Sequence, residues 1–235
     1  MKRCFVRGLW GKDEKTNRVL HRKGRVDGNI KYLLRKPFNE PFITYVWGSE
    51  NYTMLEKLGV ENLIKVSDNF FQWDLVTMQY RHKLELLRLA MIDYDEIVHL
   101  DWDCFPTKKL PIDYWETLGK KEIFQGCLFQ YKKAKCYWRT IDQRKLTNGG
   151  YVYLRDKSLP DQFIKIWESD DNKNKRSCEP TMSLWCDRYC GGWEGKEKYY
   201  NLFEPESCSL HRNSPYKIIK DSCFNHWAGL GCIRE

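Results

Sequence analysis

Residues Asp95–Asp103, with the sequence DEIVHLDWD, are the stretch that most strongly indicates the fold of this chain. Glu96–Leu100 is predicted to be a buried strand, because a short apolar run of strand length lies there between charged residues. The strand runs directly into two carboxylates, Asp101 and Asp103. Ligands of open α/β sheets bind beyond the carboxyl ends of the strands. The stretch therefore predicts an α/β sheet with a ligand site at these two carboxylates.

The pair Asp101 and Asp103 is suited to a divalent cation. If the chain leaves the strand at this point, both carboxylates can reach one ion or its coordinated water. Oxygen ligands of this kind suit Mg2+ or Mn2+, which commonly bridge a protein carboxylate to substrate phosphates. The alternative is that the two residues are a helix cap and a turn residue that follow a strand.

Outward from this stretch, apolar segments of strand length alternate with amphipathic helical segments. Further strands are predicted at residues 4–7, 42–47, 63–66, 123–129 and 151–154, and helices at 49–58, 74–92 and 160–169. This alternation is typical of an α/β domain with a mostly parallel central sheet flanked by helices. The last 45 residues are rich in Cys, Trp and Gly and are expected to be irregular structure packed on the sheet.

Length and composition favour one domain with a large core. The chain has 235 residues, of which 42% are hydrophobic and 15% aromatic, and this excludes a disordered or fibrous protein. No window approaches the roughly 18 consecutive apolar residues of a membrane helix, and the mean hydropathy is −0.69. The first residues contain no apolar stretch of the length that a signal peptide needs. We therefore expect a cytoplasmic protein without a transmembrane segment.

Net charge and cysteine content leave several classes of partner and cofactor open. A net charge of +8 suits an anionic ligand, a nucleic acid or a membrane surface. Because export is not expected, the ten cysteines favour reduced thiols or a metal site over disulfides. One group, Cys186, Cys190, Cys208 and His211, has a spacing compatible with structural Zn2+. The alternative is a set of separately buried thiols, which behave as small hydrophobic residues.

Four motifs along the chain carry a resemblance to a known family. They are Lys83-Leu84 on a predicted helix, Leu100–Asp103 (LDWD), Asn148–Leu154 (NGGYVYL) and His226–Gly229 (HWAG). In order and spacing they resemble the GT-A fold glycosyltransferases, most closely the glycogenin and galactinol-synthase-like group, over roughly residues 75 to 230. The resemblance implies a single GT-A, Rossmann-like domain over residues 1–235. Its nucleotide-binding part would be about 1–105, and its donor-sugar and acceptor part about 106–235.

The resemblance implies a metal and phosphate site. Asp103 and His226 would bind Mn2+ or Mg2+, and Asp101 would contact the ion, its coordinated water or the nucleotide ribose. Lys83 would contact phosphate or the donor sugar. A nucleotide-sugar has a diphosphate leaving group whose charge a metal and cationic side chains can neutralise. Without the other motifs, a structural role for His226 would be equally reasonable.

The resemblance also implies a donor-sugar pocket around Asn148, Gly149 and Gly150, with Asn148 as a candidate catalytic residue. The two glycines allow the sugar to approach the backbone closely. The alternative for Asn148 is an ordinary turn residue, because Asn-Gly pairs commonly form turns. Trp10 follows the first strand, where the nucleotide is held in this fold. It is expected either to stack on the nucleotide or to pack in the core.

Two departures from the family pattern point to further residues. After His226–Gly229 the family continues with Lys-Pro-Trp, whereas this chain reads LGCIRE. Arg234 is therefore the candidate for the missing charge on the diphosphate. The family's Asp-Gln-Asp element is also absent, and Cys178–Met182 occupies its place. This leaves Glu179 as the candidate catalytic or acceptor-orienting carboxylate, with an exposed loop residue as the alternative.

These observations predict a metal-dependent glycosyltransferase that uses a nucleotide-sugar donor. The acceptor is expected to be a glycan, a protein, a lipid-linked sugar or a hydroxylated base in DNA. A sugar nucleotidyltransferase is a related alternative, although its glycine-rich basic loop is not evident after the first strand. A basic, zinc-stapled nucleic-acid-binding module is a third reading. It leaves Asp101 and Asp103 unexplained, because carboxylates repel phosphates unless a metal bridges them.

Overall fold

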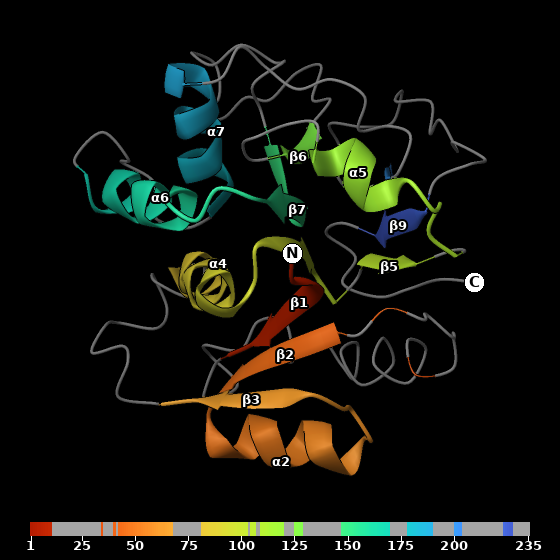
Figure 1. The fold of residues 1–235 in the computed structure, drawn as a ribbon. Coiled ribbons are helices and arrows are strands. Elements are labelled where there is room, and N and C mark those ends of the chain that lie inside the picture. The colour runs from red at the N-terminus through yellow and green to blue at the C-terminus, as the bar shows by residue number, and fades with distance from the viewer. Residues whose placement is uncertain are drawn as a thin grey trace.

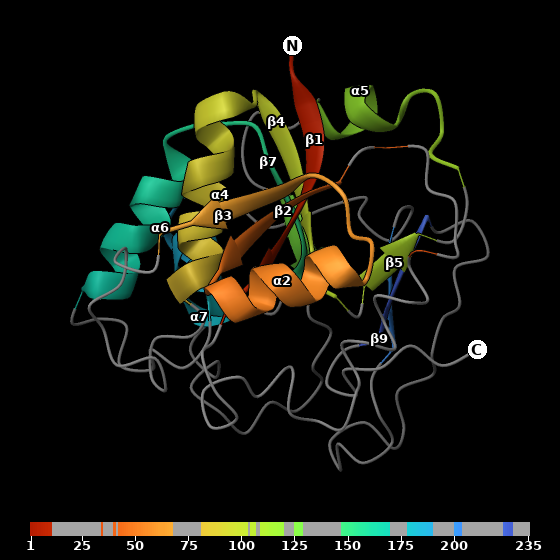
Figure 2. The same cartoon turned by 90° about the horizontal axis from the view of Figure 1, so that it is seen from below.

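Within the part of the chain that the structure describes, six strands form the central sheet, in the order β3-β2-β1-β4-β7-β6 (Figures 1 and 2). The strands are β1 (Arg3–Leu9), β2 (Phe42–Trp47), β3 (Leu63–Val66), β4 (Glu96–Leu100), β6 (Gln125–Leu128) and β7 (Thr147–Leu154). The computed structural model describes residues 1–10, 34, 40, 42–67, 81–102, 104–106, 109–119, 125–128, 147–169, 178–189, 200–203 and 223–227. For 105, 125–128, 147–148, 178–180, 187, 200–203 and 225–227 the description is limited to the backbone.

The directions of the strands bring several strand ends to one edge of the sheet. β1 pairs in parallel with β2 and β4, and β2 pairs in parallel with β3. β7 is antiparallel to both β4 and β6. β7 therefore begins at the edge where β1, β2, β3 and β4 end, and we call this the carboxyl edge. The mostly parallel sheet predicted from the sequence is confirmed, and β2, β3 and β4 have the predicted bounds.

Helices cover both faces of this sheet. α4 (Arg81–Asp93), α6 (Leu159–Glu168) and α7 (Cys178–Tyr189) share one hydrophobic cluster with the sheet. α5 (Tyr114–Gly119) belongs to a second cluster and lies on the opposite face from α4 and α6 (Figure 1). α2 (Ser49–Lys57) lies along β3 in both views (Figure 2). The predicted flanking helices are therefore present.

Local sequence accounts for two of these helices. α2 lies between Gly48 and Gly59, whose φ angles are 91° and 80°, a region of backbone space that favours glycine. α6 has Pro160 in its first turn, and Phe163 and Trp167 are fully buried on one face. Both helices were predicted within a residue or two of their observed bounds. Of the longer helix predicted at 74–92, residues 74–80 lie outside the described residues.

A second, three-stranded sheet corrects the expectation for the end of the chain. β5 (Cys104–Pro106), β9 (Phe224–Trp227) and β8 (Tyr200–Phe203) pair in the order β5-β9-β8. The last 45 residues were expected to be irregular, and for β8 and β9 this was wrong. Each strand has only four residues, and β9 pairs with β5, more than a hundred residues earlier. A local pattern does not reveal a pairing over that separation.

α7 was also absent from the sequence-based prediction. Met182, Trp185 and Cys186 are buried on one of its faces, at helical spacing. Pro180 is the third residue of this helix, and proline is well tolerated in the first turn. β7 likewise begins at Thr147, four residues before the predicted strand. Within the described residues, no helix has the length and apolar character needed to cross a membrane.

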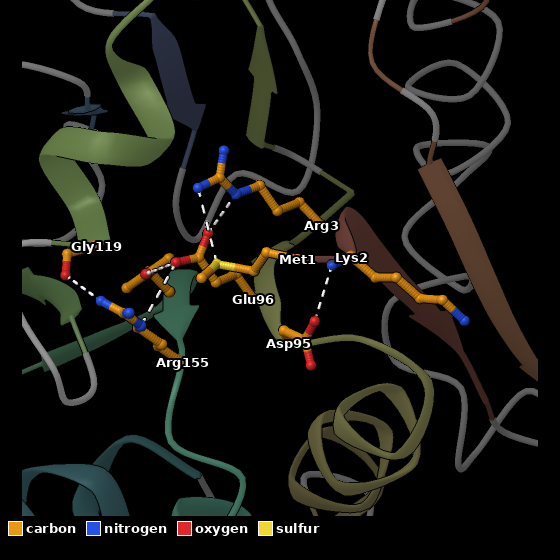
Figure 3. A network of polar contacts seen from close by, with 8 residues as sticks. Met1, Lys2, Arg3, Asp95, Glu96, Gly119 and Arg155 are labelled. Atoms are coloured by element: carbon orange, nitrogen blue, oxygen red, sulfur yellow. Dashed lines mark hydrogen bonds and ion pairs between the residues drawn. The ribbon is translucent and has the colours of Figure 1, made fainter.

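A network of charged groups closes the opposite edge of the sheet, around Glu96 at the start of β4 (Figure 3). The Glu96 side chain is 1% exposed, and its carboxylate lies 2.6 Å from Arg3 Nε and 3.7 Å from Arg155 Nε. The hydroxyl of Tyr153 donates a hydrogen bond to it at 3.1 Å. These partners compensate for burying a carboxylate. The network joins the starts of β1 and β4 to the end of β7.

Candidate active site

Asp101 lies at the carboxyl edge, directly after β4. Its backbone N–H donates to the carbonyl of Gly150 in β7 at 2.9 Å, which continues the β4–β7 pairing by one residue. The Asp101 side chain is 32% exposed. Gly149 and Gly150 are buried beside it. Asp101 and the two glycines of the Asn148–Leu154 motif therefore lie together at the carboxyl edge.

Lys83 of α4 reaches this point from the helix layer. Its Nζ lies 2.7 Å from Oδ1 of Asp101 and donates to the carbonyl of Gly149 at 3.0 Å. The Lys83 side chain is 5% exposed, so the ammonium group is largely removed from water. A buried ammonium needs a charge partner and hydrogen-bond acceptors. Asp101 and Gly149 supply both, so the lysine that the sequence placed on a helix face is in fact a buried part of the site.

His99 is a site residue that the sequence analysis did not identify. It is fully buried in β4, and its Nε2 lies 3.6 Å from Oδ1 of Asp101. Burial, and then the positive charge of Lys83, lower the pKa of His99 to about 3 from its ordinary value of 6.5. A hydrogen bond with the backbone of Gly149 acts in the opposite direction. His99 stands two residues before Asp101, and this period-two spacing on a strand could have indicated a shared face.

The chain segment after Asp101 is held against β1. The Trp102 indole N–H donates to the carbonyl of Gly8 at 2.8 Å. The Arg7 guanidinium donates to the carbonyl of Cys104 at 3.1 Å and stacks on the ring of Phe42, with 4.0 Å from its Cζ to the ring centroid. The backbone N–H of Cys104 donates back to the carbonyl of Asp101 at 2.9 Å. Trp102, after the end of β4, and Cys104, at the start of β5, are therefore both held in place by hydrogen bonds.

The small sheet brings a second predicted metal ligand toward this turn. His226 of β9 is in register with Cys104 of β5, and Cys104 is the residue that follows Asp103 in the sequence. Asp103 itself and the side chain of His226 lie outside what the structure describes. Among the described side chains, no three His, Cys, Asp or Glu residues gather as a metal site. The predicted ligand set of Asp101, Asp103 and His226 thus stays a prediction that the strand pairing favours.

Trp10 packs within the protein at the end of β1. Its ring is stacked on that of His82 at 5.6 Å between centroids and meets the edge of the Trp47 ring at 6.1 Å. A Cβ added to Gly8 would overlap the Leu86 side chain and would lie 2.7 Å from Trp10. Of the two roles expected for Trp10, core packing is therefore present. A contact of Trp10 with a nucleotide stays a prediction.

The remaining predicted residues are placed only in part. Asn148 lies in β7, in register with Cys127, and Glu179 is the second residue of α7 rather than part of a loop. Cys186 is buried in the hydrophobic cluster of α4, α6 and α7. The other predicted residues, Arg234 on the diphosphate and Cys190, Cys208 and His211 at the zinc site, lie outside the described residues. The zinc site stays a prediction.

Comparisons with known proteins identify the architecture. No family model and no curated protein sequence matches the chain. Mouse xyloside xylosyltransferase 1 in its apo form has a TM-score of 0.60 at 10% identity, with 100% of both chains covered. The apo bifunctional glycosyltransferase WbbM has a TM-score of 0.56 at 11% identity, with 97% of this chain but only 46% of WbbM covered.

The galactosyltransferase LgtC, in complex with donor and acceptor sugar analogues, has a TM-score of 0.51 at 13% identity. That comparison covers 96% of this chain and 87% of LgtC. Identities this low establish a shared fold and no more. The strand order has one antiparallel member, and helices cover both faces of the sheet. These features agree with the three structural similarities, so the chain has the GT-A fold.

Proposed function

We propose that this chain is a metal-dependent glycosyltransferase that moves a sugar from a nucleotide-sugar donor to an acceptor. The observation that carries the proposal is the ion pair between buried Lys83 and partly exposed Asp101 at the carboxyl edge, beside Gly149. A carboxylate and an ammonium group at this edge suit a diphosphate and its counter-ion. The motifs discussed above favour the glycogenin and galactinol-synthase-like group.

The residues at the turn fit a divalent cation. Asp101 offers a partly exposed carboxylate, and the pairing of β5 with β9 supports Asp103 and His226 as the other ligands. Two carboxylates and one imidazole favour Mn2+ over Mg2+, because nitrogen ligands suit Mg2+ poorly. When bound, the cation would neutralise charge on the diphosphate leaving group.

Lys83 is proposed to bind the donor diphosphate. Its charge is balanced by Asp101 in the unliganded protein. Phosphate oxygens that arrive at the same edge would provide the ammonium with a second anionic partner. Lys83 is also fixed by the carbonyl of Gly149, so it contributes a preorganised charge and needs little rearrangement on binding.

The remaining predicted residues complete the proposed pocket. Gly149 and Gly150 would let the donor sugar lie against the backbone of β7. Asn148 and Glu179 are the candidate catalytic groups, and Arg234 is the candidate second cation on the diphosphate. Trp10 would border the nucleotide at the end of β1. The acceptor is proposed to be a glycan, a protein, a lipid-linked sugar or a hydroxylated DNA base.

The test is a thermal-unfolding screen of nucleotide-sugars with and without Mn2+. We expect at least one donor to raise the midpoint of unfolding, and to do so much more strongly with Mn2+. A ligand at 100 times its Kd stabilises by about 2.7 kcal/mol, which is readily measured. Asp101→Asn should abolish the Mn2+-dependent part. Asp113→Asn is the matched control, because Asp113 is exposed and its carboxylate accepts a local hydrogen bond from Thr117 in α5.

Turnover then separates the proposal from its nearest alternative. A glycosyltransferase releases a nucleoside mono- or diphosphate from the nucleotide-sugar. A sugar nucleotidyltransferase instead releases inorganic pyrophosphate from a nucleoside triphosphate and a sugar phosphate. Failure of every nucleotide-sugar to stabilise the protein or to be consumed would overturn the proposed function.

A further inference from the structure

Trp102 occupies the position between the two carboxylates of the LDWD motif, and it points away from solvent. Its side chain is 8% exposed and joins the hydrophobic cluster of Leu9, Val46 and Leu55. Its indole N–H donates to the carbonyl of Gly8 at 2.8 Å. The residue therefore anchors the turn to β1 in two ways, by packing and by a buried hydrogen bond.

Arg7 holds the same turn from the following residues. Arg7 is 4% exposed, and its guanidinium donates to the carbonyl of Cys104 at 3.1 Å. Its Cζ lies 4.0 Å from the centroid of the Phe42 ring and 5.3 Å from that of Trp102. A planar guanidinium can stack on a ring and donate in its own plane at once, and a lysine ammonium does not reproduce that combination.

Together these contacts fix the turn at both of its ends. Trp102 secures the residue after Asp101, and Arg7 secures the carbonyl of Cys104. The bond from the Cys104 N–H to the carbonyl of Asp101 closes the segment between them. Asp103 lies between these anchored neighbours in the sequence. A site that holds a metal depends on the groups that orient its ligands, and the loss of one such group weakens binding about 10- to 100-fold.

We propose that Trp102 and Arg7 are positioning residues that set the affinity of the turn for a divalent cation. They act through Trp102 and Cys104, the two neighbours of Asp103 in the sequence, without touching the ion or the donor. The inference rests on the proposed function, because it assumes that Asp101 and Asp103 bind a cation. It goes beyond that function by assigning the affinity for the cation to two side chains that are not themselves proposed as ligands.

The test compares Trp102→Phe with the unchanged chain, using Mn2+ alone as the probe. Phenylalanine keeps a buried ring and removes the hydrogen bond to Gly8. We expect Mn2+ binding, followed by the electron paramagnetic resonance signal of the free ion, to weaken about tenfold. The matched control is Trp185→Phe, because Trp185 is 2% exposed and its indole also donates a bond of 2.8 Å, to Gln162 of α6.

Thermal unfolding of both variants separates positioning from general destabilisation. The proposal expects similar losses of stability in the two variants and a loss of Mn2+ affinity in Trp102→Phe alone. Equal Mn2+ affinity in Trp102→Phe and the unchanged chain overturns the proposal and leaves the proposed function standing. Absence of Mn2+ binding to the unchanged chain overturns the proposal together with the metal dependence. If Trp102→Phe does not fold, Arg7→Lys, which retains the charge, is measured in the same way against the same two outcomes.

Discussion

Nζ of Lys83 lies 2.7 Å from Oδ1 of Asp101, which joins α4 to the end of β4 across the carboxyl edge of the sheet. The two partners differ in their surroundings, because the lysine side chain is 5% exposed and the aspartate 32%. Removal of the lysine leaves a carboxylate that water can still reach. Removal of the aspartate leaves a buried ammonium with the carbonyl of Gly149 as an acceptor. The pair is therefore asymmetric in its response to mutation.

Lys83→Met is expected to lower the free energy of unfolding by about 2 kcal/mol, the scale of a hydrogen bond to a charged group. It should also abolish detectable stabilisation by the nucleotide-sugar that binds the unchanged chain. Chemical denaturation measures the first effect and thermal unfolding with donor and Mn2+ the second. Lys165→Met, at an exposed position of α6, should change neither. Donor binding that survives Lys83→Met would limit Lys83 to a structural role.

Stability should depend on pH through His99. Its pKa in the folded protein, about 3, lies below its ordinary value of 6.5, so the unfolded chain binds the proton more readily. Above pH 6.5 the imidazole of His99 is mostly neutral in both the folded and the unfolded chain, so His99 causes little change of stability with pH there. Between pH 6.5 and about 3, stability falls as the pH falls, by at most about 1.4 kcal/mol per pH unit for one proton.

Denaturant unfolding at several pH values between about 5.5 and 7.5 tests this expectation. This range lies more than one pH unit above the ordinary carboxylate pKa values, so paired carboxylates contribute little to the slope. His99→Gln should be less stable at pH 7.5, because a buried and packed side chain is replaced, but its stability should vary less with pH. A slope that is unchanged in His99→Gln would show that another group titrates.

His226→Ala should reduce the preference of the protein for Mn2+ over Mg2+. An imidazole nitrogen is a good ligand for Mn2+ and a poor one for Mg2+, so its loss should weaken Mn2+ more than Mg2+. We expect at least a tenfold loss of Mn2+ affinity, about the smallest effect of removing a group that only orients a ligand. Asn225→Ala, the neighbouring change in β9, is the control. Equal metal selectivity in the two variants would remove His226 from the proposed ligand set.

Gly8→Ala should destabilise the protein through packing between β1 and α4. The added methyl group would overlap Leu86 and lie 2.7 Å from Trp10, and overpacking of this kind costs about 1–3 kcal/mol. Leu86→Ala alone should also destabilise, because it leaves a cavity. The double variant should be more stable than the sum of the two losses predicts, since each change relieves the other. Additive losses in this cycle would show that the overlap relaxes elsewhere.

The sequence predicted the central sheet well and the contacts of the site less well. β2, β3 and β4 have the predicted bounds because each is an apolar run with clear limits, and Asp101 stands at the predicted edge. The small sheet was missed, since its short strands are defined by partners far away in the chain. The helix α7 was also missed. Spacing placed Lys83 on a helix, but burial and its ion pair with Asp101 are properties of the assembled layers.

His99 is a single residue whose role depends on contacts with distant parts of the chain. In the sequence it is one of two polar residues in the strand Glu96–Leu100. Its spacing from Asp101 indicates a shared face, but nothing local distinguishes a buried neutral imidazole from an exposed one. Its neighbours Lys83 and Gly149 come from α4 and β7, which are 16 and 50 residues away along the chain. Trp102 was likewise assigned no role, because its hydrogen-bond acceptor, Gly8, is 94 residues distant.

The network around Glu96 has a practical consequence for handling the protein. It secures Arg3 to β4, and the backbone N–H of Lys2 donates to Asp95 at 2.9 Å, so residue 1 emerges from the edge opposite Asp101 (Figures 2 and 3). An affinity tag, dye or surface linker fused at this point would be separated from the proposed donor pocket by the length of β1. Immobilised in this orientation, the molecule presents that pocket to the solution, where donors and acceptors can be passed over it.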